Sequence, residues 1–236
     1  MRCNAERLIE ALIAAQMMEM QLKNKTGPQG QHPCVVTISR GLGAMGKEVA
    51  QQLADTLEVR CCDRFILEEV ARRAKKDVEL VQALDEHVSH VEKHWWQKYL
   101  HKKDTFSQEE YYHYLVRVVL SISRTGGVIV GRGANIILGP EKAFRVRITG
   151  SLPICAERIA NREQINTDEA RTLVENTDRE RAAYIRTLYN ENIADTSLYD
   201  LSICSDQYTS EQIVKLILVA MRDAGQVLPE AVARAL

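Results

Sequence analysis

Short apolar runs alternate with longer amphipathic stretches from residue 34 to residue 223. The short runs predict buried strands over 34–39, 59–62, 127–130, 144–149 and 201–204. The longer stretches predict helices over 47–57, in several pieces over 63–124, from about residue 153, over 167–190 and over 210–223. Strands that alternate with helices predict an α/β fold, in which a parallel sheet is covered by helices on both faces.

The first 33 residues have a different pattern. Residues 5–24 place apolar side chains at helical spacing and predict an amphipathic helix, while residues 25–33 contain two glycines and two prolines and predict a linker. The helix either packs on the main domain or is a dimerisation or regulatory helix. The sequence therefore predicts a helix and linker over 1–33 and a main domain over 34–236.

The composition is that of a globular protein and narrows the classes of partner. Hydrophobic residues make up 45% and charged residues 27% of the 236 positions, which excludes a collagen-like or low-complexity chain. Lys and Arg number 31 against 32 Asp and Glu, for a net charge of -1. Because there is no basic surplus, nucleic acid is not expected as the main partner, although a local basic pocket for a small anion fits this balance.

The number and spacing of the cysteines indicate whether the protein belongs to a reducing or an oxidising cellular compartment. The six cysteines are scattered and form no Cys-x-x-Cys pair, which is typical of reduced thiols in a cytoplasmic protein. No apolar run approaches the roughly 20 residues that span a bilayer, and the first residues lack the pattern of a secretory signal. We therefore expect a cytoplasmic protein, monomer or homodimer, with neither a membrane nor a nucleic acid as partner.

The strongest chemical signal is a glycine-rich turn between the first predicted strand and the helix after it. Glycines let the backbone curl so that several N–H groups point at phosphate oxygens, and the helix N-terminus adds a positive dipole end. Lys47 would reach the β- and γ-phosphates of ATP and neutralise charge during transfer. The turn has the spacing G-x-x-x-x-G-K followed by Glu, and consists of Gly41, Leu42, Gly43, Ala44, Met45, Gly46, Lys47 and Glu48.

Glu48 departs from the usual phosphate-loop pattern, which has Ser or Thr at that position as a ligand of Mg²⁺. We expect its carboxylate either to approach Mg²⁺, directly or through water, or only to complement the helix N-terminus. The glycines also match G-x-G-x-x-G, and Asp63 lies about 20 residues further on, so a dinucleotide-binding loop is one alternative. A plain tight turn between strand and helix is the other.

Four segments together resemble the cytidylate kinase-like family, a branch of the P-loop nucleoside monophosphate kinases. They are residues 36–48 (VTISRGLGAMGKE), 62–67 (CDRFIL), 128–133 (VIVGRG) and 199–203 (YDLSI). The resemblance implies a three-layer P-loop kinase fold with a helical acceptor-binding insertion over 77–124 and an arginine-bearing lid over 153–190. It also implies transfer of the γ-phosphate of ATP to a nucleoside monophosphate, with CMP or dCMP as the first candidate and Mg²⁺ as the metal.

The resemblance places acceptor-binding residues just after two of the predicted strands. Asp63 matches an aspartate that lines the acceptor site of cytidylate kinases, and the neighbouring Arg64 suits a phosphate. Arg132 matches the arginine of a Gly-Arg-Asp motif that contacts the acceptor, and is also a catalytic candidate. The alternatives are that Asp63 only caps the following helix, and that Arg132 forms a structural ion pair with Asp63.

Two departures from the family pattern fall in this region. Gly133 replaces the aspartate of the Gly-Arg-Asp motif, and Glu68 and Glu69 stand where cytidylate kinases have a Tyr-Arg pair. Together with Glu48 they leave open a regulatory protein that binds nucleotide without turnover. A P-loop kinase with a non-nucleotide acceptor is a further alternative.

Arginines between residues 153 and 190 are the candidates for the lid, where they would stabilise the charge on transferring phosphates. Two registers onto the family are open. One matches Asp178, Arg179 and Arg181; the other matches Arg179, Glu180 and Arg186. A solvated helix with ion pairs one turn apart would show the same pattern. The candidates are Arg158 and Arg162 for the nucleotide, and Arg179, Arg181 and Arg186 for catalysis.

Two other features complete the candidate list. By its position after the last strand, Asp206 matches a family loop that contacts adenine. Four histidines would share one helix face and could bind a metal, although a wet polar face has the same pattern. Two adjacent tryptophans would pack the insertion or cover the acceptor. These residues are His87, His90, His94 and His101, and Trp95 and Trp96.

Overall fold

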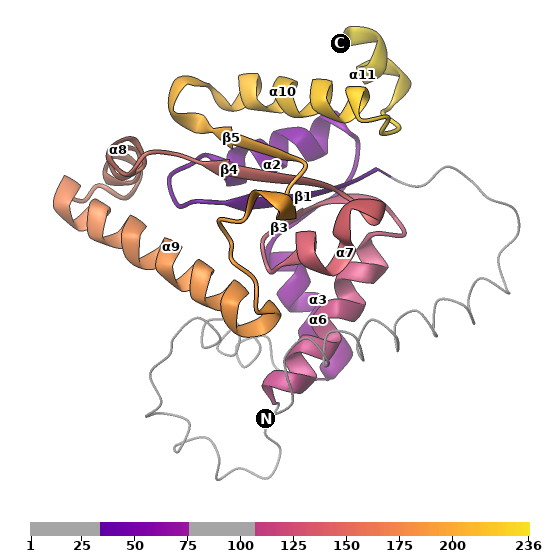
Figure 1. Cartoon of the computed structure of the whole chain (residues 1–236), viewed down its shortest axis with the longest axis horizontal. Coiled ribbons are helices and arrows are strands. Elements are labelled where there is room, and N and C mark those ends of the chain that lie inside the picture. The colour runs from indigo at the N-terminus through magenta and orange to yellow at the C-terminus, as the bar shows by residue number, and fades with distance from the viewer. Residues whose placement is uncertain (1–33, 76–106) are drawn as a thin grey trace, which may run out of the picture.

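The computed structural model describes residues 34–75 and 107–236, and a five-stranded parallel sheet lies at its centre (Figure 1). The strand order is β2-β3-β1-β4-β5. At the middle of the sheet, Val36 of β1 pairs with Val128 of β3 on one side and with Phe144 of β4 on the other. The strands are β1 (Val35–Arg40), β2 (Cys61–Cys62), β3 (Gly127–Val130), β4 (Phe144–Thr149) and β5 (Leu201–Cys204). The predicted α/β fold with a parallel sheet is confirmed.

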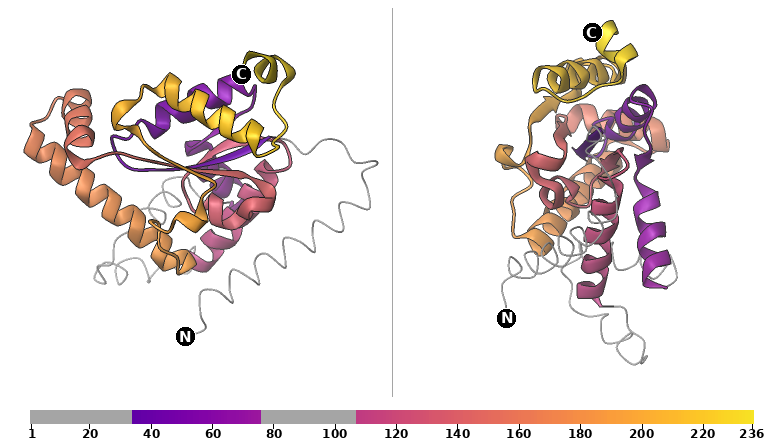
Figure 2. Two further views of the ribbon diagram at one scale, coloured as in Figure 1. Left: turned by 45° about the horizontal axis from the view of Figure 1, so that its top comes forward. Right: turned by 90° about the vertical axis from the view of Figure 1, so that its right-hand side faces the viewer.

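Helices cover both faces of this sheet and form the outer two of three layers (Figures 1 and 2). One face is covered by α2 (Gly46–Thr56) and α10 (Ser210–Asp223). The other is covered by α3 (Arg64–Ala74), α6 (Gln108–Ile122) and α7 (Ala134–Lys142). The remaining elements are α8 (Leu152–Glu163), the long α9 (Thr167–Tyr189), α11 (Glu230–Ala235) and two 3-10 turns, Thr196–Leu198 and Ser205–Gln207.

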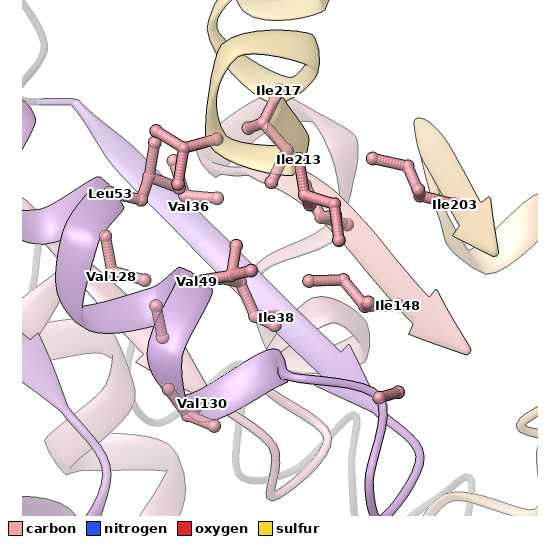
Figure 3. Packing of buried hydrophobic residues seen from close by; sticks show 14 of the residues in the cluster. Val36, Ile38, Val49, Leu53, Val128, Val130, Ile148, Ile203, Ile213 and Ile217 are labelled. Carbon is pink, nitrogen blue, oxygen red and sulfur yellow. The ribbon is translucent and has the colours of Figure 1, made fainter. Parts of the chain in front are cut away.

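The central strand shows why the sheet is buried on both faces. Val36 and Ile38 are at most 1% exposed and pack with Val49 and Leu53 of α2 and with Ile213 of α10 (Figure 3). Residues on alternate positions face the opposite layer, as the period of a strand requires. Fully burying one such aliphatic side chain stabilises the fold by about 1.5–3 kcal/mol. This packing fixes β1, and with it the loop that β1 leads into.

Several boundaries differ from the prediction for local reasons. Only Cys61 and Cys62 of the strand predicted over 59–62 pair with a neighbour. The chain before them is still turning, because Glu58 has a φ of 55° and the N–H of Val59 donates to the carbonyl of Ala54 at 2.9 Å. The helix α7 was not predicted, since Gly139 interrupts its dihedral angles and Pro140 follows. The short α11 was not predicted either.

The predicted helical region over 63–124 is confirmed at both of its ends, by α3 and α6. The N-terminal helix and linker, the four histidines and the two tryptophans lie outside the described residues, and the domain boundaries at 33 and 34 stay predictions. Among the helices of residues 34–75 and 107–236, none has the length and apolar character that crossing a membrane requires.

Candidate active site at the carboxyl end of the sheet

The glycine-rich turn has the backbone that an anion cradle requires. It follows β1 directly, and the N–H of Gly41 donates to the carbonyl of Ile148 on the neighbouring strand at 2.9 Å. Gly43 has a φ of 77°, and a Cβ there would lie 2.5 Å from the carbonyl oxygen of Cys155, so only glycine fits. Met45, with a φ of 60°, caps α2 without a side-chain hydrogen bond. The first amides of α2 are therefore placed to bind an anion rather than a side-chain cap.

The two charged residues that open α2 are accessible. Lys47 and Glu48 follow Gly46 in the first turn of the helix, and both side chains are exposed. The ammonium of Lys47 is therefore free to approach an anion bound by the amides at the start of α2. Mg²⁺ in such sites is held by one or two carboxylates and by the phosphates, not by a cage of protein ligands. Glu48 supplies one exposed carboxylate beside the loop, and its role toward Mg²⁺ stays a prediction.

The long helix α9 supplies two side chains that close on the loop. The carboxylate of Asp178 accepts a hydrogen bond from the N–H of Leu42 at 2.9 Å. Arg181 donates through Nη1 to that same carboxylate at 3.2 Å and to the carbonyl of Arg40 at 3.1 Å. Burial lowers the pKa of the Arg181 guanidinium, and the charge of Asp178 opposes that shift. Asp178 and Arg181 thus lie against the glycine-rich loop, and both registers for the lid stay predictions.

The other arginines of the lid region differ in their surroundings. Arg158 donates to the carbonyl of Gly43 at 3.2 Å and to the hydroxyl and carbonyl of Ser205, both at 2.9 Å, so it ties the phosphate loop to the turn after β5. Arg162 pairs with the adjacent Glu163 on the surface. Arg179 is exposed and donates to Asn176 at 3.0 Å, and Arg186 is exposed. The roles of Arg162, Arg179 and Arg186 stay predictions.

Asp206 lies in the turn after β5, next to the residue that Arg158 holds. Its carboxylate accepts a hydrogen bond from the N–H of Ser151 at 2.9 Å, and this bond lowers the pKa of the Asp206 carboxyl. The turn is thus fixed beside the phosphate loop, on the β4–β5 side. The predicted contact of Asp206 with adenine stays a prediction.

The acceptor candidates lie on the other side of the loop, after β2 and β3. Asp63 occupies the N-cap position of α3, but its side chain makes no capping hydrogen bond; its carboxylate instead faces the guanidinium of Arg40, with Oδ1 and Nη2 3.9 Å apart. Arg132 has a φ of 54° between two glycines whose φ values are also positive. The structure therefore brings Asp63 and Arg132 to the same edge as the phosphate loop. Arg64 begins α3, and its role stays a prediction.

The sequence comparisons agree with this arrangement. A model of the cytidylate kinase-like family matches residues 35–207, which is most of the chain. The chain belongs to the cytidylate kinase-like family. This membership makes it a kinase-like protein and favours a phosphate loop over a dinucleotide loop.

Individual relatives of this family are distant. The cytidylate kinase of Methanocaldococcus jannaschii is 25% identical over 193 residues, covering 79% of this chain and 97% of that protein. The cytidylate kinase of Methanopyrus kandleri is 26% identical over 104 residues, and the match spans only 54% of its length. In structure, an uncharacterized protein from Eubacterium ventriosum has a TM-score of 0.59 at 17% identity, covering 80% of this chain and 98% of that one. That likeness supports the fold alone.

The departure from the family at Gly133 has a steric cause. Gly133 has a φ of 68°, and a Cβ at this position would overlap the ring of Tyr189, with the phenolic oxygen 2.7 Å away. Tyr189 is the last residue of α9, and its hydroxyl donates to the carbonyl of Arg132 at 2.5 Å. The aspartate of the family's Gly-Arg-Asp motif therefore cannot be accommodated while Tyr189 holds this place.

The departure at Glu69 also has a structural explanation. The Glu69 carboxylate forms ion pairs with Arg72 at 2.6 Å and with Arg73 at 2.7 Å on its own helix. Hydrogen bonds, first from Arg72 and then from Arg73, lower its pKa to about 2, although burial opposes the shift. Glu69 and Arg73 line a pocket of about 420 Å³ between α3 and α6, and neither Asp63 nor Arg132 lines it. Glu68 is exposed.

Further residues near the site were not predicted from the sequence, among them Arg147, Ser39, Tyr199 and Arg40. Arg147 of β4 donates to the hydroxyl of Ser39 at 2.9 Å and lies over the ring of Tyr199, 5.5 Å from its centroid. Tyr199 in turn donates to the carbonyl of Ile193 at 3.0 Å. Arg40 ends β1 immediately before the phosphate loop. One signal could have found it, because Arg40 is an arginine at the carboxyl end of a buried strand, and Arg132 lies just past the end of another.

Proposed function

We propose that this protein is an ATP-dependent phosphotransferase that moves the γ-phosphate of ATP to a nucleoside monophosphate, with CMP or dCMP as the first candidate. One observation supports this most strongly. The phosphate loop of β1 and α2 shares one edge of the sheet with the loops of Asp63 and Arg132, and α9 closes on it through Asp178 and Arg181. Ligands of open parallel sheets bind at this carboxyl edge.

The proposed mechanism needs positioning and charge neutralisation, not a protein nucleophile. The amides at the start of α2 hold the phosphates of ATP, and the Lys47 ammonium neutralises charge as the γ-phosphoryl group leaves. Arg132 orients the acceptor phosphate, and Arg181 adds positive charge from the lid side. Glu48 would hold Mg²⁺, which would offset the negative charge of the phosphates. We place the reaction in the cytoplasm.

A second function is favoured by the contact between Gly133 and Tyr189. Because this contact excludes a carboxylate that cytidylate kinases use for the acceptor, the chain could bind nucleotide as a regulatory protein without turnover, or use an acceptor other than a nucleotide.

The test is an ADP-release assay with ATP, Mg²⁺ and a panel of CMP, dCMP, UMP, AMP and GMP. We expect acceptor-dependent release with at least one of them, and at least a tenfold loss of turnover or ATP affinity in Lys47→Ala, equivalent to about 1.4 kcal/mol. Lys215→Ala is the matched control, because Lys215 is an exposed lysine of α10. Nucleotide binding without release in the panel would refute the kinase activity proposed here and favour the second function. If Lys47→Ala and Lys215→Ala had the same turnover and the same ATP affinity, the assignment of residues 41–47 as a phosphate loop would be refuted.

A further inference from the structure

Arg40 connects the phosphate loop to the acceptor side of the site. It is the last residue of β1, and its aliphatic stem lies against Gly46, where a Cβ would be 2.5 Å from that of Arg40. Its guanidinium covers Gly131, where a Cβ would overlap Nη1. Two glycines, one from each loop, therefore make room for this one side chain.

The strand order explains why the guanidinium of Arg40 lies near Asp63. From β1 the side chain passes the carboxyl end of β3, the adjacent strand, and approaches Asp63 after β2, the strand beyond. The two side chains form an ion pair with Nη2 and Oδ1 3.9 Å apart. Arg40 keeps 23% and Asp63 31% of their side-chain surface exposed. Both side chains are therefore only partly buried, between the loops assigned to the acceptor.

The side chain of Arg40 has the chemistry that a phosphate requires, although the carboxylate of Asp63 offsets part of its charge. A guanidinium presents a planar fork of donors that matches two phosphate oxygens, and lysine does not reproduce this fork. Arg132 follows Gly131, the residue that the Arg40 guanidinium covers, so the two arginines lie on adjoining parts of one edge. Arg181, which donates to the carbonyl of Arg40, fixes the backbone from which the side chain projects.

We propose that Arg40 binds the phosphate of the acceptor together with Arg132, which makes the acceptor site a two-arginine site for a phosphorylated small molecule. The proposal rests on the proposed function, because it takes the ATP phosphates to occupy the loop of residues 41–47. In the competing arrangement Arg40 is a structural link between β1 and the Asp63 turn, and touches no substrate. If Arg40 binds the acceptor phosphate, loss of its guanidinium weakens phosphate binding and leaves AMP-PNP binding intact. If Arg40 is only a structural link, the same loss does not weaken phosphate binding selectively.

The experiment uses the full chain as wild type, Arg40→Lys and Arg40→Gln. Calorimetry first measures the affinity for AMP-PNP with Mg²⁺, and then the affinity for inorganic phosphate at saturating AMP-PNP, which fills the γ-phosphate position. The matched control is Arg145→Lys, because Arg145 lies near the amino end of β4 and is held by Asp200. Thermal unfolding of each variant measures any structural effect.

We expect Arg40→Gln to weaken phosphate binding at least tenfold and Arg40→Lys to an intermediate degree, with AMP-PNP affinity within twofold of wild type. Arg145→Lys should lower the melting temperature without selective loss of phosphate. Undiminished phosphate binding in both Arg40 variants, an equal loss of both ligands, or no phosphate binding by wild type would overturn the inference about Arg40. Failure of the wild type to bind AMP-PNP would refute the proposed function itself, and the inference with it.

Discussion

Replacing Gly133 by alanine should strongly destabilise the protein, because one methyl group would create two separate problems. The first is conformational, since Gly133 has a φ of 68°. A left-handed conformation costs a residue with a Cβ about 1–2 kcal/mol. The second is steric, since the new Cβ would overlap the ring of Tyr189. Overpacking of this kind typically costs about 1–3 kcal/mol. The expected loss in the free energy of unfolding is therefore about 2–5 kcal/mol.

Gly225→Ala separates the two contributions. Gly225 has a φ of 75°, but a Cβ there would meet no atom within 4 Å. This control should therefore lose only the conformational part, about 1–2 kcal/mol. The assay is urea unfolding of both variants, followed by fluorescence and by circular dichroism. In the double variant Gly133→Ala, Tyr189→Leu, the steric part should disappear, so that the losses of the two single variants are not additive.

Two results would refute this reasoning. If Gly133→Ala lost no more stability than Gly225→Ala, Tyr189 would not occupy the space beside Gly133. If the double variant lost the sum of both single effects, the steric contact would not be the cause of the destabilisation.

Three further predictions concern charged residues around the site. Glu48→Gln should weaken the Mg²⁺ dependence of ATP turnover, measured by titrating Mg²⁺ at fixed ATP; an unchanged dependence would exclude a metal role. Arg158→Ala should lower the free energy of unfolding by about 2–3 kcal/mol in urea, because the carbonyl of Gly43 and the backbone of Ser205 lose a charged donor. Glu69→Gln should lower the melting temperature at pH 7. Because the folded pKa of Glu69 is about 2 and its ordinary value is 4.5, its stabilisation is present above pH 4.5 and is lost as the pH falls toward 2, so the two melting temperatures should converge in acid.

Local patterns in the sequence were sufficient to predict the sheet and the phosphate loop. A strand such as β1 is marked by consecutive apolar residues, and the loop after it by glycines at fixed spacing and one lysine. These features depend on neighbours within a few positions along the chain. Lys47 and Arg132 are recognisable for the same reason, because Lys47 ends the glycine-rich turn and Arg132 follows the apolar run 128–130.

The rest of the site depends on contacts between distant segments, which a single sequence does not encode in a local pattern. Asp178 lies 136 positions from Leu42, and nothing near it in the chain indicates that its carboxylate meets a loop amide. Tyr189 lies in an ordinary helix-end position, so its place beside Gly133 was not predictable. Arg158 donates to the carbonyls of Gly43 and Ser205, which are 115 and 47 positions away in the chain, and its predicted contact with the nucleotide stays a prediction.

The helix α9 has 23 residues and is about 35 Å long, and its contacts with α6 and with the glycine-rich loop lie far apart along it. At its carboxyl end, Tyr189 packs edge-on against Tyr112 of α6 with ring centroids 5.8 Å apart, and the hydroxyl of Tyr184 lies 3.3 Å from that of Tyr111. Asp178 lies eleven positions earlier, about 16 Å along the helix.

One helix therefore joins the tyrosine contacts with α6 to the glycine-rich loop. Because about 16 Å of helix separates Tyr189 from Asp178, a tilt of about 10° around Tyr189 would displace Asp178 by about 3 Å. A displacement of that size would break the 2.9 Å hydrogen bond between Asp178 and the N–H of Leu42. The position of this loop contact thus depends on how α6 and α9 pack about 16 Å away.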